Sequence, residues 1–119
     1  MKKSFADILK EEESGLLRRM ALKVPEWSGI DGLSFPTKLC TEQCSSSATA
    51  IYKASVAAAA VSSRGIGFPH IADLTGGLGV DSWAFGKAGF TVSYNEMNST
   101  LAEAARANFK LTGAENIAV

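Results

Sequence analysis

The chain has 119 residues, and its 12 Lys and Arg balance 12 Asp and Glu to a formal net charge of zero. This balance excludes a free-standing polyanion binder, which needs clustered basic residues, and the 46% hydrophobic and 20% charged content excludes a disordered chain. The apolar runs are too short to span a bilayer and the N-terminus does not resemble a signal peptide, so we expect one cytoplasmic domain, or part of one, without a membrane partner.

Residues 1–67 are predicted to form a helical N-terminal extension and a connector. Ser4 and Asp7 have the spacing of a capping box that opens a helix, and Gly15 weakens the middle of that helix, giving one kinked helix or two short ones. Residues 24–36 are predicted to form an ordered connector with a short hairpin, because four turn-forming residues alternate with four apolar anchors: Pro25, Gly29, Gly32 and Pro36, and Trp27, Ile30, Leu33 and Phe35. An alanine-rich helix is expected over residues 48–62, stopped at Gly65.

Residues 68–119 are predicted to form a partial Rossmann-like domain. Strands are expected at residues 71–74 and 90–94, with a third beginning at 116–119; helices are expected at 80–88 and from Ser99 or Thr100 to 110. Strands that alternate with helices through short turns form a parallel sheet with right-handed crossovers. The predicted fold class is therefore α/β: a helical extension followed by the first half (βαβαβ) of a Rossmann-like sheet.

The chemistry is expected at the carboxyl ends of the first two predicted strands. The run Asp73-Leu74-Thr75-Gly76-Gly77-Leu78-Gly79 follows the first strand, and Glu96 follows the second. Glycines in a strand-to-helix turn allow a ligand to approach the backbone closely, and a carboxylate after the second strand can accept hydrogen bonds from ribose hydroxyls. This pattern indicates an adenosine-containing ligand without choosing its class.

Two classes of ligand use this geometry. A dinucleotide favours G-x-G-x-x-G, but here Ser82 takes the third glycine position and Asp81 places negative charge where a pyrophosphate would lie. S-adenosylmethionine carries a sulfonium and an ammonium in place of phosphates, and the acid at Asp73 suits it. An NAD-dependent oxidoreductase is therefore the disfavoured alternative, and a non-catalytic nucleotide-binding module is a second one.

The run from Asp73 to Gly79, with Glu96, resembles the first two cofactor motifs of class I S-adenosylmethionine-dependent methyltransferases. The stretch Glu42-Gln43-Cys44-Ser45-Ser46 and the residues that follow it are similar to a segment before the core in bacterial methyltransferases that carry a C-terminal THUMP-like domain. That group is related to RNA guanine-N2 methyltransferases. The resemblance covers roughly residues 33–119.

The resemblance implies methyl transfer to an RNA base, with S-adenosylmethionine as cofactor. The implied cofactor-binding residues are Asp73, Thr75, Gly76, Gly77, Gly79, Glu96, Met97, Glu42 and Gln43. Met97 would contact adenine, whereas Glu42 and Gln43 would either line the pocket or cap the next helix. No metal site is expected, because Cys40, Cys44 and His70 do not complete a ligand set.

The sequence departs from a whole class I core in ways that limit these expectations. It reaches only the third of the usual seven strands, and it has neither the Asp/Asn-Pro-Pro motif that holds the target amine nor a THUMP-like domain. We therefore expect an N-terminal fragment that is inactive by itself and whose catalytic residues lie elsewhere. Open sheet edges would favour its self-association.

Overall fold

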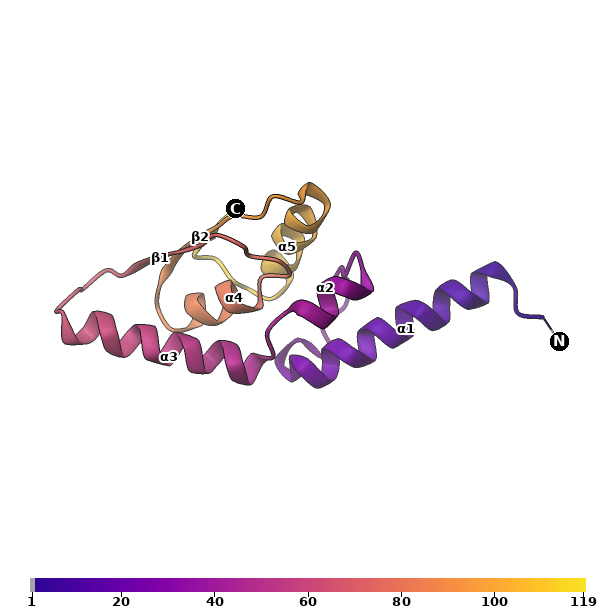
Figure 1. Cartoon of the computed structure of the whole chain (residues 1–119), viewed down its shortest axis with the longest axis horizontal. Coiled ribbons are helices and arrows are strands. Elements are labelled where there is room, and N and C mark those ends of the chain that lie inside the picture. Colours follow the sequence, from indigo (N-terminus) through magenta and orange to yellow (C-terminus); the bar gives the residue numbers. More distant parts are fainter. Residues whose placement is uncertain (1) are drawn as a thin grey trace.

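The computed structural model describes residues 2–119. Its elements, in chain order, are α1 (Phe5–Lys23), the 3-10 helix η1 (Pro25–Trp27), α2 (Lys38–Gln43), α3 (Ser47–Ser63), β1 (His70–Asp73), α4 (Val80–Lys87), β2 (Thr91–Tyr94), α5 (Ser99–Leu111) and β3 (Ile117–Ala118). Figure 1 shows α4 between the strands and α3, with α1 extending away from the rest of the molecule toward the N-terminus.

The first helix begins as predicted but is not interrupted. Ser4 accepts a hydrogen bond from the backbone N–H of Asp7, and the Asp7 side chain bonds back to the N–H of Ser4, which confirms the capping box. Of the two alternatives predicted from Gly15, two short helices was wrong, because α1 runs unbroken through 19 residues. One glycine costs a helix only about 1 kcal/mol, which capping and neighbouring turns can offset.

The connector contains no hairpin, so that prediction was wrong. It folds into η1 and then an extended segment, with Pro25 at the start of η1 fixing the backbone dihedral that begins the turn. A short helix, α2, then begins at a Thr37 cap whose side chain accepts the N–H of Cys40. The following helix, α3, begins at Ser46, which accepts the N–H of Thr49.

The sheet is parallel and three-stranded, in the order β1-β2-β3. His70 pairs with Thr91 and Val92 with Ile117, and β1 begins one residue earlier than predicted. Alternate residues of β2 are buried: Val92 and Tyr94 pack inward, whereas Thr91 is exposed. This architecture confirms the predicted α/β class and the partial Rossmann-like arrangement.

One hydrophobic core joins the N-terminal helices to the sheet. Trp27 of η1 packs edge-on against Trp83 of α4, with ring centroids 5.7 Å apart. The fully buried amide of Asn108 in α5 accepts from the backbone N–H of Ser34 at 2.8 Å and donates to its carbonyl at 2.9 Å. Most buried polar groups in proteins are paired in this way, and here the pairing attaches the connector to α5 by polar as well as apolar contacts.

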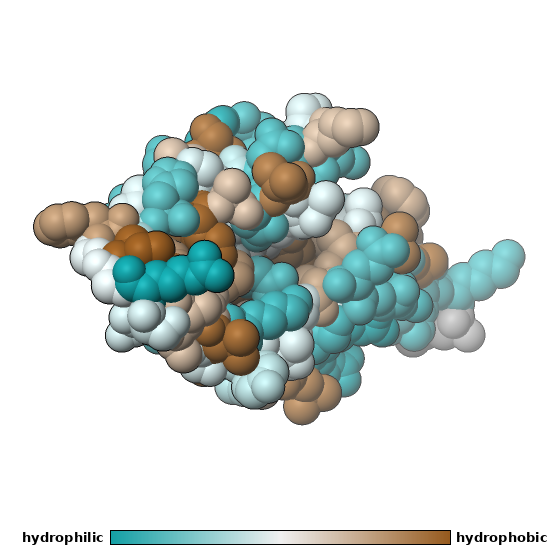
Figure 2. All heavy atoms as spheres, turned by 60° about the vertical axis from the view of Figure 1, so that its left-hand side comes forward, coloured by the Kyte–Doolittle hydropathy of each residue, from teal (hydrophilic) through white to brown (hydrophobic). Residues whose placement is uncertain are grey.

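Large apolar side chains also remain at the surface. Phe68 is fully exposed, and Leu22, Leu74 and Met97 are largely exposed. On the face shown in Figure 2, hydrophobic residues form separate spots among hydrophilic ones. Within residues 2–119, no helix combines the length and apolar character needed to cross a bilayer.

Candidate functional site

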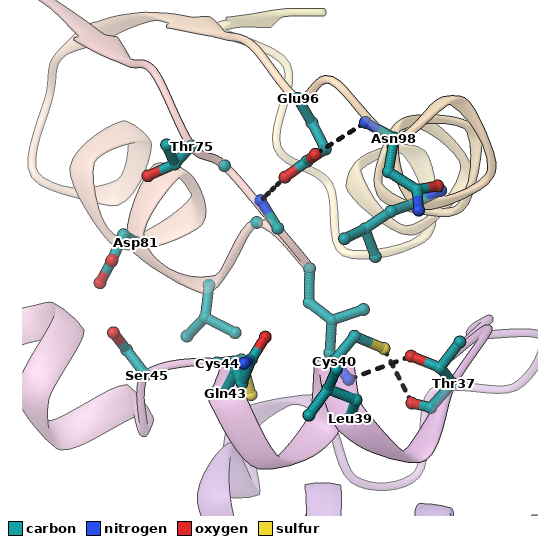
Figure 3. A pocket seen from close by; sticks show the side chains of 16 residues that line it. Thr37, Leu39, Cys40, Gln43, Cys44, Ser45, Thr75, Asp81, Glu96 and Asn98 are labelled. Carbon is teal, nitrogen blue, oxygen red and sulfur yellow. Dashed lines mark hydrogen bonds between the residues drawn. The ribbon is translucent and has the colours of Figure 1, made fainter.

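A pocket of about 480 Å³ lies between α2 and the glycine-rich turn that joins β1 to α4 (Figure 3). Its volume falls within the range of about 300–1,000 Å³ that is usual for small-molecule sites. It opens at the carboxyl ends of β1 and β2, where parallel sheets bind ligands. The lining residues are Thr37, Leu39, Cys40, Gln43, Cys44, Ser45, Thr75, Gly76, Gly77, Leu78, Gly79, Val80, Asp81, Glu96, Asn98 and Leu101.

The glycines of the turn have two different roles. A Cβ on Gly76 would lie 2.1 Å from the ring of Tyr94, and one on Gly79 would lie 2.4 Å from the ring of Phe109. These two rings contact each other edge-on, with centroids 5.4 Å apart, so the turn rests on an aromatic support. Gly77 instead has a φ of +55° and open space where a Cβ would be. Its backbone is therefore the part of the turn that a ligand can approach most closely.

Glu96 holds the turn and the start of α5 together. One carboxylate oxygen accepts the backbone N–H of Gly77 at 3.1 Å, and the other accepts the backbone N–H of Asn98 at 2.8 Å (Figure 3). A carboxylate has about four lone-pair positions, so acceptor capacity remains for a ligand. The predicted residue Glu96 therefore lines the pocket with its carboxylate already oriented.

Asp73 lies at the end of β1 but is not among the lining residues. Its Oδ2 accepts a hydrogen bond from the hydroxyl of Ser82 at 2.7 Å, and Ser82 is completely buried. The pair connects the strand end to the first turn of α4, directly beneath the glycine turn. Ser82, which occupies the position of a third glycine in dinucleotide motifs, thus has a structural partner here.

Tyr94 also supports the turn from below. Its hydroxyl donates to the carbonyl of Gly77. Burial, followed by the nearby charges of Glu96 and Asp73, raises the pKa of Tyr94 above its ordinary value of 10. The phenol is therefore a hydrogen-bond donor and not a base at physiological pH.

The structure separates the other predicted site residues. Thr75, Gly76, Gly77, Gly79 and Gln43 line the pocket, whereas Glu42 and Met97 do not. The alternative role predicted for Glu42 and Gln43, capping the next helix, is taken by Ser46, which caps the start of α3.

Glu42 faces away from the pocket toward α1. Its Oε1 lies 2.8 Å from Arg19 Nη1, and this hydrogen bond to Arg19 lowers the pKa of Glu42 below its ordinary value. Met97 is 94% exposed at the surface. Neither side chain lines the pocket, and their contact with a cofactor stays a prediction.

Apart from Gln43, sequence reasoning missed the contribution of α2 to the pocket, and it did not assign Asp81 to the site. The side chains of Cys40, Cys44 and Ser45 form the wall opposite the glycine turn, and Asp81 lies beside them at the start of α4. The Thr37 cap could have revealed α2, since Thr followed by a short run before a Ser-Ser-Ser segment fits two successive capped helices. Burial raises the pKa of the Cys44 thiol, so it is not an activated nucleophile.

The charged residues that line the pocket are acidic, and one of them, Asp81, is ion-paired with Lys53 of α3, which is not a lining residue. Among the lining residues, all of which lie in the described part of the chain, Asp81 and Glu96 carry charge and no Lys or Arg is present. Such a wall favours a cationic group and disfavours a pyrophosphate, which requires positive charge or free amides without adjacent carboxylates.

Comparison with known proteins supports this description of the fold. The chain matches the crystal structure of a "putative methyltransferase" from Porphyromonas gingivalis W83 with a TM-score of 0.70 and 34% sequence identity over 90% of its length. The chain spans 25% of the length of that larger protein. No protein-family model and no curated protein matches the sequence. The fold is thus that of part of a Rossmann-like methyltransferase.

Proposed function

We propose that the chain is the S-adenosylmethionine-binding part of a methyltransferase. The observation that carries this proposal is the pocket at the glycine turn, whose only charged lining side chains within residues 2–119 are Asp81 and Glu96. S-adenosylmethionine presents a sulfonium, an ammonium and a ribose diol, and each of these is complementary to a carboxylate. The similarity to a methyltransferase fold over 90% of the chain supports the same assignment.

The residues of the pocket fit this ligand in distinct ways. Glu96, held by two backbone amides, would accept the ribose hydroxyls. Gly77 would let the ligand approach the backbone, and the Asp73–Ser82 pair would position the turn without touching the ligand. When bound, the cofactor supplies an electrophilic methyl group, and the contribution of these residues is to orient it and to complement its positive charge.

The acceptor is proposed from resemblance. The segment around Glu42–Ser46 is similar to one in bacterial methyltransferases that are related to RNA guanine-N2 methyltransferases. We therefore propose an RNA base as the substrate of the longer protein, with the acceptor-binding residues outside residues 1–119. The fragment alone would bind cofactor without turning it over.

Calorimetric titration tests the cofactor assignment. We expect the chain to bind S-adenosylhomocysteine saturably and not to bind NAD. Both Glu96→Ala and Glu96→Gln should weaken binding about 10- to 100-fold, because a charged hydrogen bond contributes about 1.5–3 kcal/mol. The control is Glu115→Gln, which removes an exposed carboxylate outside the pocket.

Thermal unfolding of each variant shows whether a loss of binding is a loss of fold. Binding of NAD alone would contradict the proposal. Binding of neither ligand by a folded chain would also count against it, and equal binding by the wild-type and Glu96 variants would remove Glu96 from the site.

A further inference from the structure

An ion pair joins Asp81, which lines the pocket, to a lysine that the cofactor assignment above does not use. Lys53 of α3 lies across from Asp81 of α4, with its Nζ 3.2 Å from Oδ2 and 3.4 Å from Oδ1. The same ammonium lies 3.1 Å from the hydroxyl of Ser45. The Lys53 side chain is 47% exposed and that of Asp81 29% exposed. Asp81 and Ser45 line the pocket, and Lys53 contacts both of them without being a lining residue itself.

The pair differs from the other carboxylates near the turn. Asp73 is occupied by Ser82, and Glu96 by the amides of Gly77 and Asn98. Asp81 has neither kind of partner in residues 2–119, and its one cation is a half-exposed lysine. In Figure 3 the side chains of Asp81 and Ser45 point toward one another across the opening beside the glycine turn.

We propose that Lys53 and Asp81, with Ser45, recognise the zwitterionic α-amino-acid end of the ligand. Asp81 would accept the ligand's ammonium, and Lys53 with Ser45 would bind its carboxylate. This inference rests on the proposed function and deepens it by assigning the end of the ligand that Glu96 does not hold.

The chemistry of the pair fits a zwitterion better than a single charge. A half-exposed ion pair contributes little to stability, so opening it costs little. A zwitterion replaces that one pair with two, one for each charged side chain, and leaves neither charge uncompensated. A simple cation would satisfy Asp81 but would repel Lys53.

The position of Asp81 relative to Glu96 suits one ligand that reaches both residues. Glu96 and Asp81 lie on opposite sides of the glycine turn in Figure 3, as the ribose end and the amino-acid end of one extended ligand require. Ser45 and Asp81 line the same pocket as Glu96. Because α3 supplies Lys53, the N-terminal helices contribute to ligand recognition and not only to packing.

Two ligands that differ only at the amino-acid end test the inference. S-adenosylhomocysteine carries the zwitterion, whereas 5′-methylthioadenosine keeps the nucleoside and the sulfur without it. We expect wild-type protein to bind the first more tightly than the second in calorimetric titrations. Asp81→Asn and Lys53→Met should each weaken S-adenosylhomocysteine about tenfold or more and leave methylthioadenosine unchanged.

The controls separate this inference from the proposed function. Glu96→Gln should weaken both ligands, and Glu115→Gln should weaken neither. Unchanged binding of methylthioadenosine shows that each variant is folded, and a thermal melt checks this independently. The excess affinity for S-adenosylhomocysteine should also fall with added salt.

Each result decides one of the two claims. If wild-type protein binds neither ligand, the proposed function fails and the inference fails with it. If both ligands bind equally well, or if Asp81→Asn weakens both to the same extent, the cofactor assignment survives and the inference is overturned.

Discussion

The ring of Tyr94 fills the space that a side chain on Gly76 would need, since a Cβ there would lie only 2.1 Å from Cε2 of the ring. The glycine is therefore required by packing from below the turn, whereas Gly77 is open to the pocket. Of the two adjacent glycines, Gly76 makes room for the Tyr94 ring and Gly77 leaves the backbone open on the pocket side.

Gly76→Ala should destabilise the chain by about 1–3 kcal/mol, because Tyr94 must move out of a packed position. Urea denaturation measures the change. Gly67→Ala is the matched control, since a Cβ there meets nothing within 4 Å and its φ is not positive. An effect of equal size in both variants would argue against the steric explanation.

Ser82→Ala should lower stability by about 1.5–3 kcal/mol, because it leaves the half-buried Asp73 carboxylate without its 2.7 Å donor. The same denaturation assay applies. Ser63→Ala is the control, because that serine is exposed and bonds only to the Ala60 carbonyl of its own helix. A neutral result for Ser82→Ala would show that the Asp73 carboxylate finds another partner.

Stability should fall at alkaline pH through Tyr94. Its folded-state pKa is raised, so the stabilisation is fully present below the ordinary value of 10 and is lost as the pH rises above it. Tyr94→Phe should be about 1 kcal/mol less stable near neutral pH, because the bond to the Gly77 carbonyl is lost, and should decline less steeply above pH 10. Parallel slopes in the two proteins would refute this role.

Asn108→Ala should destabilise the chain by at least about 2 kcal/mol, because it leaves two backbone groups of Ser34 unpaired as well as removing packing. Unfolding should stay a single transition for wild-type protein, since the connector and α5 share one core. The exposed Asn98→Ala, which removes the α5 cap, should cost about 1 kcal/mol. Two separate transitions in wild-type protein would contradict a shared core.

Self-association is expected from the sheet. Within residues 2–119, β1 and β3 each pair on one side only, with β2, and so leave open edges. Sedimentation velocity over a range of concentrations should show a rising mean mass. A monomer at every concentration would contradict this expectation.

The sequence predicted the elements whose patterns are local. The capping box at Ser4, the helix stop after Ser63 and the alternation of strands and helices after Phe68 are all read from neighbouring residues, and the fold class followed from them. The predicted start of β1 was one residue too late, because His70 pairs with Thr91 and extends the ladder.

Relationships between distant residues were not predictable in the same way. The hairpin prediction failed because Trp27 is buried against Trp83, 56 positions along the chain, and this contact favours a compact turn over strand pairing. The ion pair of Asp81 was not predicted, because its partner, Lys53, lies on another helix. The glycine turn and Glu96 were identified because their spacing is itself the signal.

The contact between Trp27 and Trp83 provides an intrinsic spectroscopic probe of how η1 packs on α4. These are its two tryptophans, their rings meet at 81° with centroids 5.7 Å apart, and one belongs to the connector while the other belongs to α4. Two indoles so close together couple electronically, so their circular dichroism and fluorescence should change together when η1 leaves α4. The docking of the N-terminal segment can therefore be followed in real time without a label.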